Sequence, residues 1–459
     1  MPSDSFDSSS KLLSDSTLPA SNPRPSPLTP EVTAPTSLQR TIYSSLRPPP
    51  FPTNSALWPK LARQAVPAPN FGYVHDSAGT GSTCLANVDA FNQYRLKPRM
   101  LVDATHRDLS VTLFGQTYAS PLLVAPVGVQ EIMHTDAEIA TAEACRNVKV
   151  PMILSTAATR TIEEVASASG DGDRWYQLYW PRSEYEDVTA SLLGRAKREG
   201  YKVLVVTLDT FTIGWRPVDL DTSYLPFLWG QGCAVGFSDP VFQRRVEEEL
   251  GRDERGVGEK LREVRDLLLR PGTPWGALKV LRNLRVMQRS QMWLSVMNSG
   301  TYRKWEDLRV LRELWGDGPI VLKGIQTVED AQRAVEFGMD GIIVSNHGGR
   351  QLNGAIASLD ALRDVCADET VKRSGLTVLF DSGVRTGVDV LKAMCLGAKG
   401  VLIGRPYMYG LAMGGQSGVE HVLNCLLAEV DNSLGQMGKR SVKDLSRGDL
   451  EMRKQQAKL

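Results

Sequence analysis

His347 and Arg350 are the two residues in this chain whose types and spacing most directly suggest chemistry. They lie three residues apart in the segment SNHGGRQ (345–351), so one short loop would carry both. A guanidinium can bind both oxygens of a carboxylate, and an imidazole can accept a proton near neutral pH. The pair therefore suits a substrate with an acidic proton beside a carboxylate. Asp209 could orient the imidazole and raise its pKa, although a lone histidine is more often a structural hydrogen-bonding residue.

Polar side chains also follow most of the short apolar runs elsewhere in the chain. Gln177 and Tyr179 are two residues apart, so they would lie on the same side of a strand. The other such residues are Thr207, Asp209 and Arg216 around the fourth run, Lys323 at the fifth, Ser345 at the sixth, Asp381 and Arg385 at the seventh, and Gly404 and Arg405 at the eighth. Each could belong to a structural ion pair or a tight turn. Their recurrence at run after run favours one shared functional site.

The apolar runs themselves alternate with helix-like stretches. They cover 121–128, 152–156, 175–180, 203–209, 320–324, 341–347, 377–383 and 400–406. Eight buried strands alternating with helices predict an α/β fold in which a parallel sheet closes on itself, the (β/α)₈ TIM barrel. The carboxyl ends of the strands in such a barrel form the active-site face.

A long insertion is predicted between the fourth and fifth strands, over residues 217–303. An insertion at this point would hang over the active-site face, so we expect a lid or an assembly element. Its charged central stretch, VEEELGRDERGVGEKLREVRDLLLR, is typical of a solvated helix face.

The last two strand ends suggest a phosphate site. Gly383 and Gly404 would let backbone N–H groups approach an anion, and Arg385 and Arg405 would neutralise it. Barrels of this kind frequently bind phosphate at this place. The alternative is that the glycines serve tight turns and the arginines form surface ion pairs.

Composition excludes several classes of protein. Lys and Arg number 53 and Asp and Glu number 52, so the net charge of +1 argues against a nucleic-acid partner. No apolar run approaches the length of about 20 residues that a membrane helix needs. The six cysteines are scattered without a CxxC pair, and no His or Cys pair has metal-ligand spacing, so we expect neither disulfides nor a metal.

The chain divides into two parts by composition. Residues 1–55 are rich in Ser and Pro and are predicted to be a disordered tail, whereas residues 56–459 form the barrel. The chain ends in Ala457-Lys458-Leu459, a variant of the Ser-Lys-Leu peroxisomal signal. We expect a peroxisomal location, with the cytoplasm as the alternative.

With these residues in place, the segment SNHGGRQ resembles the signature of the FMN-dependent 2-hydroxy-acid oxidases and dehydrogenases. The likeness extends from about Asn70 to Asp449. It is greatest to lactate 2-monooxygenase, through stretches similar to FGYV, WYQLYWP, LVVTLDT, WRPVDLD, YLPF and DGPIVLKGIQ, and through the long insertion. The resemblance implies that residues 56–459 bind FMN.

The resemblance also implies a role for each residue. His347 would be the catalytic base, paired with Asp209. Tyr179 would hydrogen-bond the substrate hydroxyl, and Lys323 would lie by flavin N1 and O2. Tyr73, Arg216 and Arg350 would hold the substrate carboxylate. The remaining flavin contacts would be Pro126, Val127, Gly128, Ser155, Gln177, Thr207, Ser345, Asp381, Gly383, Arg385, Gly404 and Arg405.

The implied reaction is oxidation of an L-2-hydroxy acid, lactate-like, to the 2-oxo acid by hydride transfer to FMN. The tail is too short and polar for a haem domain, so we expect O₂ as the oxidant, with either H₂O₂ release or oxidative decarboxylation. Ala157 stands where glycolate oxidase carries a tryptophan, which leaves room for a larger substrate side chain. The alternatives are an FMN barrel isomerase, a tailoring dehydrogenase of secondary metabolism and a non-enzymatic scaffold. Because members of this family are often tetramers or octamers, the resemblance also implies that this chain forms a homo-oligomer of one of these sizes.

Overall fold

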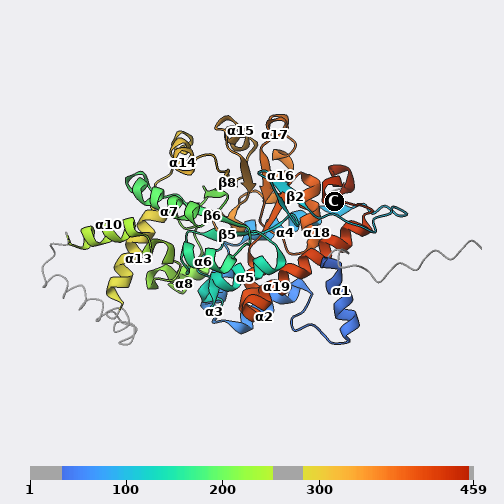
Figure 1. Ribbon diagram of the computed structural model, residues 1–459, viewed down its shortest axis with the longest axis horizontal. Coiled ribbons are helices and arrows are strands. Elements are labelled where there is room, and N and C mark those ends of the chain that lie inside the picture. Colours follow the sequence, from blue (N-terminus) through green and yellow to red (C-terminus); the bar gives the residue numbers. More distant parts are fainter. Residues whose placement is uncertain (1–33, 252–282, 454–459) are drawn as a thin grey trace, which may run out of the picture.

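The fold is built around a closed barrel of eight parallel strands, and the prediction of a TIM barrel is confirmed (Figure 1). The structure is a computed structural model that describes residues 34–251 and 283–453. The strands are β4 (Leu122–Val124), β5 (Met152–Ser155), β6 (Arg174–Tyr179), β7 (Leu204–Thr207), β8 (Ile320–Ile325), β9 (Gly341–Val344), β10 (Thr377–Phe380) and β11 (Gly400–Ile403). They pair in sequence order, and β11 closes the barrel against β4.

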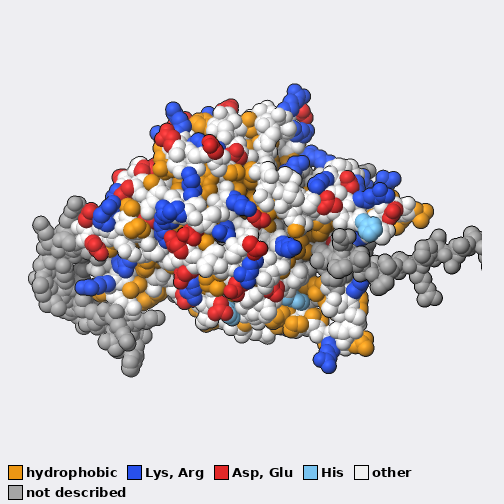
Figure 2. All heavy atoms as spheres, viewed as in Figure 1, with side chains coloured by type: hydrophobic (Ala, Val, Ile, Leu, Met, Phe, Trp, Pro, Cys, Tyr) orange, Lys and Arg blue, Asp and Glu red, His pale blue; other side chains and the backbone are white. Residues whose placement is uncertain are grey.

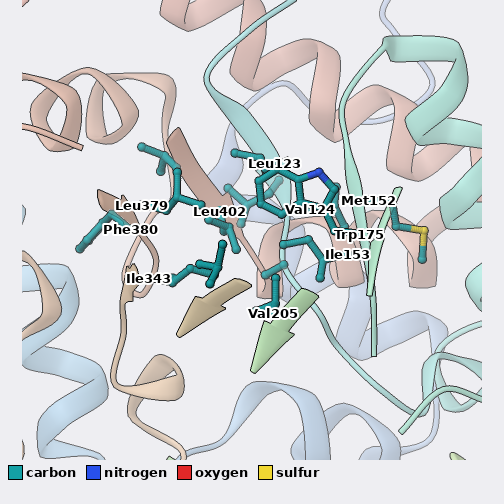
Figure 3. Close-up of a cluster of buried hydrophobic side chains, with 14 of the residues drawn as sticks. Leu123, Val124, Met152, Ile153, Trp175, Val205, Ile343, Leu379, Phe380 and Leu402 are labelled. Atoms are coloured by element: carbon teal, nitrogen blue, oxygen red, sulfur yellow. The ribbon is translucent and has the colours of Figure 1, made fainter. Parts of the chain in front are cut away.

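These segments become strands because they are short, rich in β-branched residues and buried on both faces. Leu123, Ile153, Val205, Ile343 and Leu402 are almost completely buried, and Figure 3 shows them gathered with their neighbours inside the barrel. The interior is thus a packed core rather than a channel, so the chemistry must lie at an end of the barrel.

Helices cover the outside of the barrel, and side-chain caps set where several of them begin. They are α5 (Ala137–Val148), α6 (Ile162–Ser169), α7 (Glu186–Arg198), α14 (Leu308–Trp315), α15 (Val328–Glu336), α16 (Ser358–Val365), α17 (Glu369–Ser374), α18 (Gly387–Leu396) and α19 (Arg405–Gln436). Thr161 and Thr386 each form a capping box with an acidic residue three positions later, which satisfies the free N–H groups of α6 and α18.

The prediction that residues 1–55 are disordered is wrong for the part that the structure describes. Residues 34–45 form α1 (Ala34–Ser45), which packs against α19. Phe51 packs edge-to-face on His421 of α19, and the indole N–H of Trp58 donates to the carbonyl of Pro52. These aromatic anchors, which the polar composition concealed, hold the segment on the barrel. Residues 1–33 lie outside the described residues.

Further elements at the amino-terminal side were not predicted. They are α2 (Trp58–Ala65), α3 (Ala68–His75), α4 (Ser82–Asn92), β1 (Tyr94–Leu96), the hairpin β2 (Val111–Leu113) with β3 (Gln116–Tyr118), and β12 (Leu450–Met452), which pairs with β1. The hairpin turn places Phe114 edge-to-face on Trp175 of β6. It therefore covers the amino ends of the strands, opposite the face where the polar residues emerge.

The insertion after β7 is confirmed in its described parts. They comprise α8 (Pro217–Asp221), α9 (Ala234–Phe237), α10 (Pro240–Gly251) and α13 (Leu284–Met297), and α10 and α13 lie to one side of the barrel in Figure 1. Asp239 anchors it, since its buried carboxylate pairs with Arg195 of α7 at 3.3 Å. Residues 252–282, which include most of the predicted charged helix, lie outside the described residues.

The surface carries mixed charge. Figure 2 shows basic and acidic side chains interspersed over the visible face, as the net charge of +1 leads one to expect. In the ranges described, no helix is both long enough and apolar enough to cross a membrane, and no cluster of His, Cys, Asp or Glu could hold a metal. The tripeptide Ala457-Lys458-Leu459 lies outside these ranges, so the choice between peroxisome and cytoplasm stays a prediction.

Candidate active site

A hollow opens at the carboxyl ends of the barrel strands. Most of the predicted site residues line it. They are Tyr73, Pro126, Val127, Gly128, Tyr179, Arg216, Lys323, His347, Arg350, Asp381, Gly383, Arg385, Gly404 and Arg405. Residues that are more than 300 positions apart in the chain, such as Tyr73 and Arg405, therefore line the same hollow.

His347 stands on the loop that follows β9, in a backbone conformation with φ of +58°. Asn346 fixes this loop, because its side-chain oxygen accepts the N–H of Gly349 at 3.1 Å. The N–H of His347 itself donates to the hydroxyl of Ser345 at 3.1 Å. These hydrogen bonds fix the backbone of the turn that carries His347, and this turn sets the position of the imidazole.

The imidazole of His347 faces a carboxylate. Its Nδ1 lies 2.9 Å from Oδ1 of Asp209, and the hydroxyl of Thr210 bonds the same carboxylate oxygen at 2.7 Å. Burial lowers the pKa of His347 below its ordinary 6.5, against the raising effect of Asp209. Burial would raise the pKa of Asp209, but the positive charges of His347 and Lys323 hold it well below its usual range. Asp209 is therefore ionised, and Nδ1 is the nitrogen it orients, which leaves Nε2 for other partners.

Lys323 lies at the end of β8 between two carboxylates. Its Nζ is 3.4 Å from Asp381 and 4.0 Å from Asp209, and it donates to the hydroxyl of Ser345 at 2.9 Å. Burial would lower its pKa, but Asp381 and Asp209 raise it above the ordinary value. The side chain is only 4% exposed, so the hollow holds a permanent, poorly hydrated positive charge.

Two guanidinium groups that line the hollow lie close together, those of Arg350 and Arg216. The guanidinium of Arg350 donates to the carbonyl of Asp76 at 3.0 Å and lies over the ring of Tyr73 at 5.3 Å. Arg216 donates from Nε to the carbonyl of Arg350 at 3.1 Å. Burial and the charge of Arg216 lower the pKa of Arg350 to about 9. A bound anion would stabilise this pair, because its negative charge relieves the repulsion between the two cations.

Besides Asp209, four of the predicted residues lie behind the hollow rather than on its lining. Gln177 accepts from the hydroxyl of Ser155 at 3.1 Å and donates to Thr207 at 2.9 Å, while Ser345 supports Lys323. All four are almost fully buried, so they fix the floor on which the lining residues stand. Their direct contact with a flavin stays a prediction.

The end of the hollow beside β10 and β11 has the predicted glycines and arginines. Burial and the charge of Arg405 lower the pKa of Arg385, as expected for two cations without an anion between them. Arg405 is largely occupied, since it donates to the carbonyls of His75, Asp76 and Gly348. A guanidinium has five N–H donors, so one N–H on each Nη remains for a ligand.

Some lining residues were not predicted from the sequence. Phe227 and Asn298 come from the insertion, Ile213 and Thr210 from the segment after β7, and Ser382 from the turn after β10. Asn298 donates to the carbonyl of Thr210 at 3.0 Å, so the carboxyl end of α13 contacts the residue beside Asp209. No local sequence pattern predicts that Asn298 reaches the hollow, because its position depends on how the whole insertion folds back.

The model of the FMN-dependent dehydrogenase family matches residues 62–452 of this chain. The chain belongs to this family. An FMN-dependent alpha-hydroxy acid dehydrogenase, qulF, of Penicillium citrinum is 45% identical over 87% of this chain and 91% of its own length. An L-lactate oxidase of Lysinibacillus sphaericus is 36% identical over 86% of this chain and 92% of its own. A crystal structure of mandelate oxidase, 32% identical, covers 88% of this chain and 99% of that one with a TM-score of 0.69.

Membership makes the chain an FMN-dependent enzyme of the alpha-hydroxy acid oxidase and dehydrogenase family, as the sequence predicted. The hollow fits FMN on its own geometry. A Cβ atom on Gly128 would lie 2.5 Å from the carbonyl oxygen of Ala157, and one on Gly383 would lie 2.3 Å from that of Asn87. Only glycine fits at these two positions, so the turns that carry them pack directly against neighbouring backbone at the edge of the hollow. Arg385 and Arg405, after β10 and β11, and Lys323, on β8, match a ligand with a phosphate and a ring that takes up negative charge.

Proposed function

We propose that this enzyme oxidises an L-2-hydroxy acid, lactate-like or larger, to the corresponding 2-oxo acid with O₂ as the final oxidant. The observation that carries the proposal is the shared hollow, in which His347 and its carboxylate partner face two guanidinium groups and a buried ammonium. The reaction balances as one hydroxy acid plus O₂ giving one 2-oxo acid plus H₂O₂. The L-lactate oxidase relative supports the choice of O₂.

Arg350 and Arg216 would bind the substrate carboxylate. Unlike Lys323, which lies 3.4 Å from Asp381, they have no carboxylate at hydrogen-bonding distance in the described part of the chain, since the nearest one, Asp219, is 3.9 Å from Arg216. A guanidinium can hold a carboxylate through two parallel N–H···O bonds, which fixes orientation as well as position. Binding there would hold the C2 hydroxyl on the side of His347.

His347 would accept the hydroxyl proton at Nε2, while Asp209 stabilises the resulting imidazolium through Nδ1. Burial raises the pKa of Tyr179, with the nearby Asp209 adding to this, so its phenol keeps its proton and can donate a hydrogen bond to the substrate oxygen. Bound FMN supplies the two-electron acceptor. Lys323 would keep a fixed positive charge beside the place where negative charge accumulates. A route in which His347 takes the C2 proton would use the same residues.

The pH dependence of the reaction follows from His347. A base must be neutral to accept a proton, and burial lowers the pKa of this histidine below 6.5. We expect kcat/KM to be constant around neutral pH and to fall about tenfold per unit as pH drops below the pKa of the free enzyme. Steady-state kinetics between pH 4.5 and pH 8 measure this. A decline that begins above pH 7 would contradict the assignment.

Substrate size is the property that Ala157 should control. This residue lines the hollow beside Gly128, and its methyl group leaves space that a larger side chain would fill. We expect Ala157→Trp to lower kcat/KM for mandelate at least tenfold relative to glycolate, because the indole takes the room of the aryl group. Glycolate is the internal control for a general loss of activity. Equal losses for both acids would place the substrate side chain elsewhere.

A homo-oligomer, tetramer or octamer, is proposed as well. Trp215 and Leu352 are 74% and 66% exposed, and both border the segment 79–83, where Gly79 donates to the carbonyl of Trp215 and Thr83 to that of Leu352. Apolar side chains exposed together are typical of protein contacts. Light scattering on the FMN-loaded enzyme should give a tetramer or octamer, and a monomer would refute the proposal.

The decisive experiment for the product is a panel of L-2-hydroxy acids in aerated buffer, with H₂O₂ and CO₂ both measured. One H₂O₂ per 2-oxo acid identifies an oxidase. Stoichiometric CO₂ and a shortened acid without H₂O₂ identify the decarboxylating outcome, in which the peroxide consumes the 2-oxo acid before it leaves. No O₂ consumption with any acid would contradict O₂ as the oxidant and would favour a dehydrogenase or an isomerase.

A further inference from the structure

Ser382 has a backbone conformation that its residue type disfavours. Its φ is +85°, in the region where only glycine is free of steric conflict. The residue lies in the turn after β10, is 9% exposed and lines the hollow. Strain of this kind persists where surrounding interactions hold it, and it gathers at functional sites.

The hydroxyl of Ser382 makes two hydrogen bonds inside the site. It donates to Oδ1 of Asp381 at 2.7 Å and accepts the backbone N–H of Gly348 at 3.0 Å. Gly348 directly follows His347, whose own N–H is bound by the hydroxyl of Ser345. The two peptide N–H groups on either side of the His347 α-carbon are thus both held by serine hydroxyls.

The two serines are connected through an ion pair. Lys323 donates to the hydroxyl of Ser345 at 2.9 Å and lies 3.4 Å from the carboxylate of Asp381, which Ser382 binds. The N–H groups of His347 and Gly348 are therefore both connected, each through a serine hydroxyl, to the same Lys323–Asp381 pair. A glycine at position 382 would remove the backbone strain, but it would also cut one of these two ties.

We propose that Ser382 is a positioning residue for His347, a proposal that rests on the proposed function. Its hydroxyl holds the loop so that the backbone of His347 keeps its φ of +58°. In this conformation the imidazole keeps its 2.9 Å contact with Asp209. Without it, Gly348 loses its partner and the loop gains freedom to turn the imidazole away from the carboxylate. The effect falls on the orientation of the base rather than on substrate binding, because Arg350 and Arg216 are held by other contacts.

The test compares Ser382→Gly, which relieves the strain and removes the hydroxyl, with Ser382→Ala, which keeps the strain and removes the hydroxyl. We expect kcat to fall roughly 10- to 100-fold in both, with KM and FMN content unchanged. The kinetic isotope effect with C2-deuterated substrate should rise, because the chemical step becomes slower. A purely structural role would lower the melting temperature without changing that isotope effect.

Ser223→Gly is the matched control. Ser223 is an exposed serine with φ of +50°, so this change also relieves strain but touches nothing in the hollow, and its kinetics should equal those of the wild type. A crystal structure of Ser382→Gly gives an answer that needs no turnover. We expect the distance from His347 Nδ1 to Asp209 Oδ1 to exceed about 3.5 Å. Wild-type kinetics in Ser382→Gly, or an unmoved imidazole, would overturn the proposal, whereas a wild type that turns over no 2-hydroxy acid refutes only the proposed function.

Discussion

His347→Gln is expected to lower kcat for 2-hydroxy-acid oxidation by about 10³-fold or more while leaving FMN bound. Glutamine has similar bulk and can still donate to Asp209, which lies 2.9 Å from Nδ1 in the native enzyme. It cannot accept a proton, so the contribution of a general base, typically 10²- to 10⁴-fold, is lost. Rapid mixing without O₂ measures the rate at which the flavin is reduced, and the absorbance spectrum measures bound FMN.

His106→Gln is the control for that change, because His106 is exposed and lies outside the hollow. It should reduce flavin at the wild-type rate. If His347→Gln also retained that rate, another group would have to be the base. Loss of FMN from His347→Gln would show instead that the histidine supports the cofactor site.

Replacement of Arg350 is the second change with a large expected effect. Removing one partner of a buried, hydrogen-bonded charge pair costs roughly 2–5 kcal/mol, or about 30- to 4,000-fold in kcat/KM. We expect this loss in Arg350→Met, mostly as a higher KM. Arg350→Lys should recover only part of it, since an ammonium keeps the charge but not the two parallel donors. Steady-state kinetics on a 2-hydroxy acid measure both.

A substrate amide separates carboxylate binding from damage to the fold. Arg350 also donates to the carbonyl of Asp76, so its loss could loosen α3. A 2-hydroxy amide has no carboxylate, and its slow turnover should change much less in Arg350→Met than that of the acid. Equal losses for the acid and the amide would mean that Arg350 acts through structure.

The barrel could be predicted because each strand carries its own signal. Segments such as VLVVTLD (203–209) and TVLFDSG (377–383) combine a buried β-branched run with a polar end, and these short-range patterns survive in the fold. The prediction for residues 34–55 was wrong because single contacts hold this segment in place: Phe51 packs on His421 of α19, and Trp58 of α2 donates to the carbonyl of Pro52. An average over composition does not detect such contacts.

The site could be predicted in its residues but not in its contacts. Parallel strands bring their carboxyl ends to one face, which is why Asp209, Lys323 and His347 meet although they come from three strands. The approach of Asn298 to Thr210 depends on the path of the insertion, and the ties of Ser382 depend on an unfavourable φ value. Neither leaves a periodic or compositional pattern in the sequence.

Anaerobic titration of the purified yellow enzyme with L-lactate or another L-2-hydroxy acid tests most directly whether this enzyme oxidises 2-hydroxy acids. The flavin absorbance should bleach with one equivalent of acid, and the 2-oxo acid should appear in equal amount. A flavin that stays oxidised with every 2-hydroxy acid offered, in enzyme that retains FMN, would contradict the proposed oxidation.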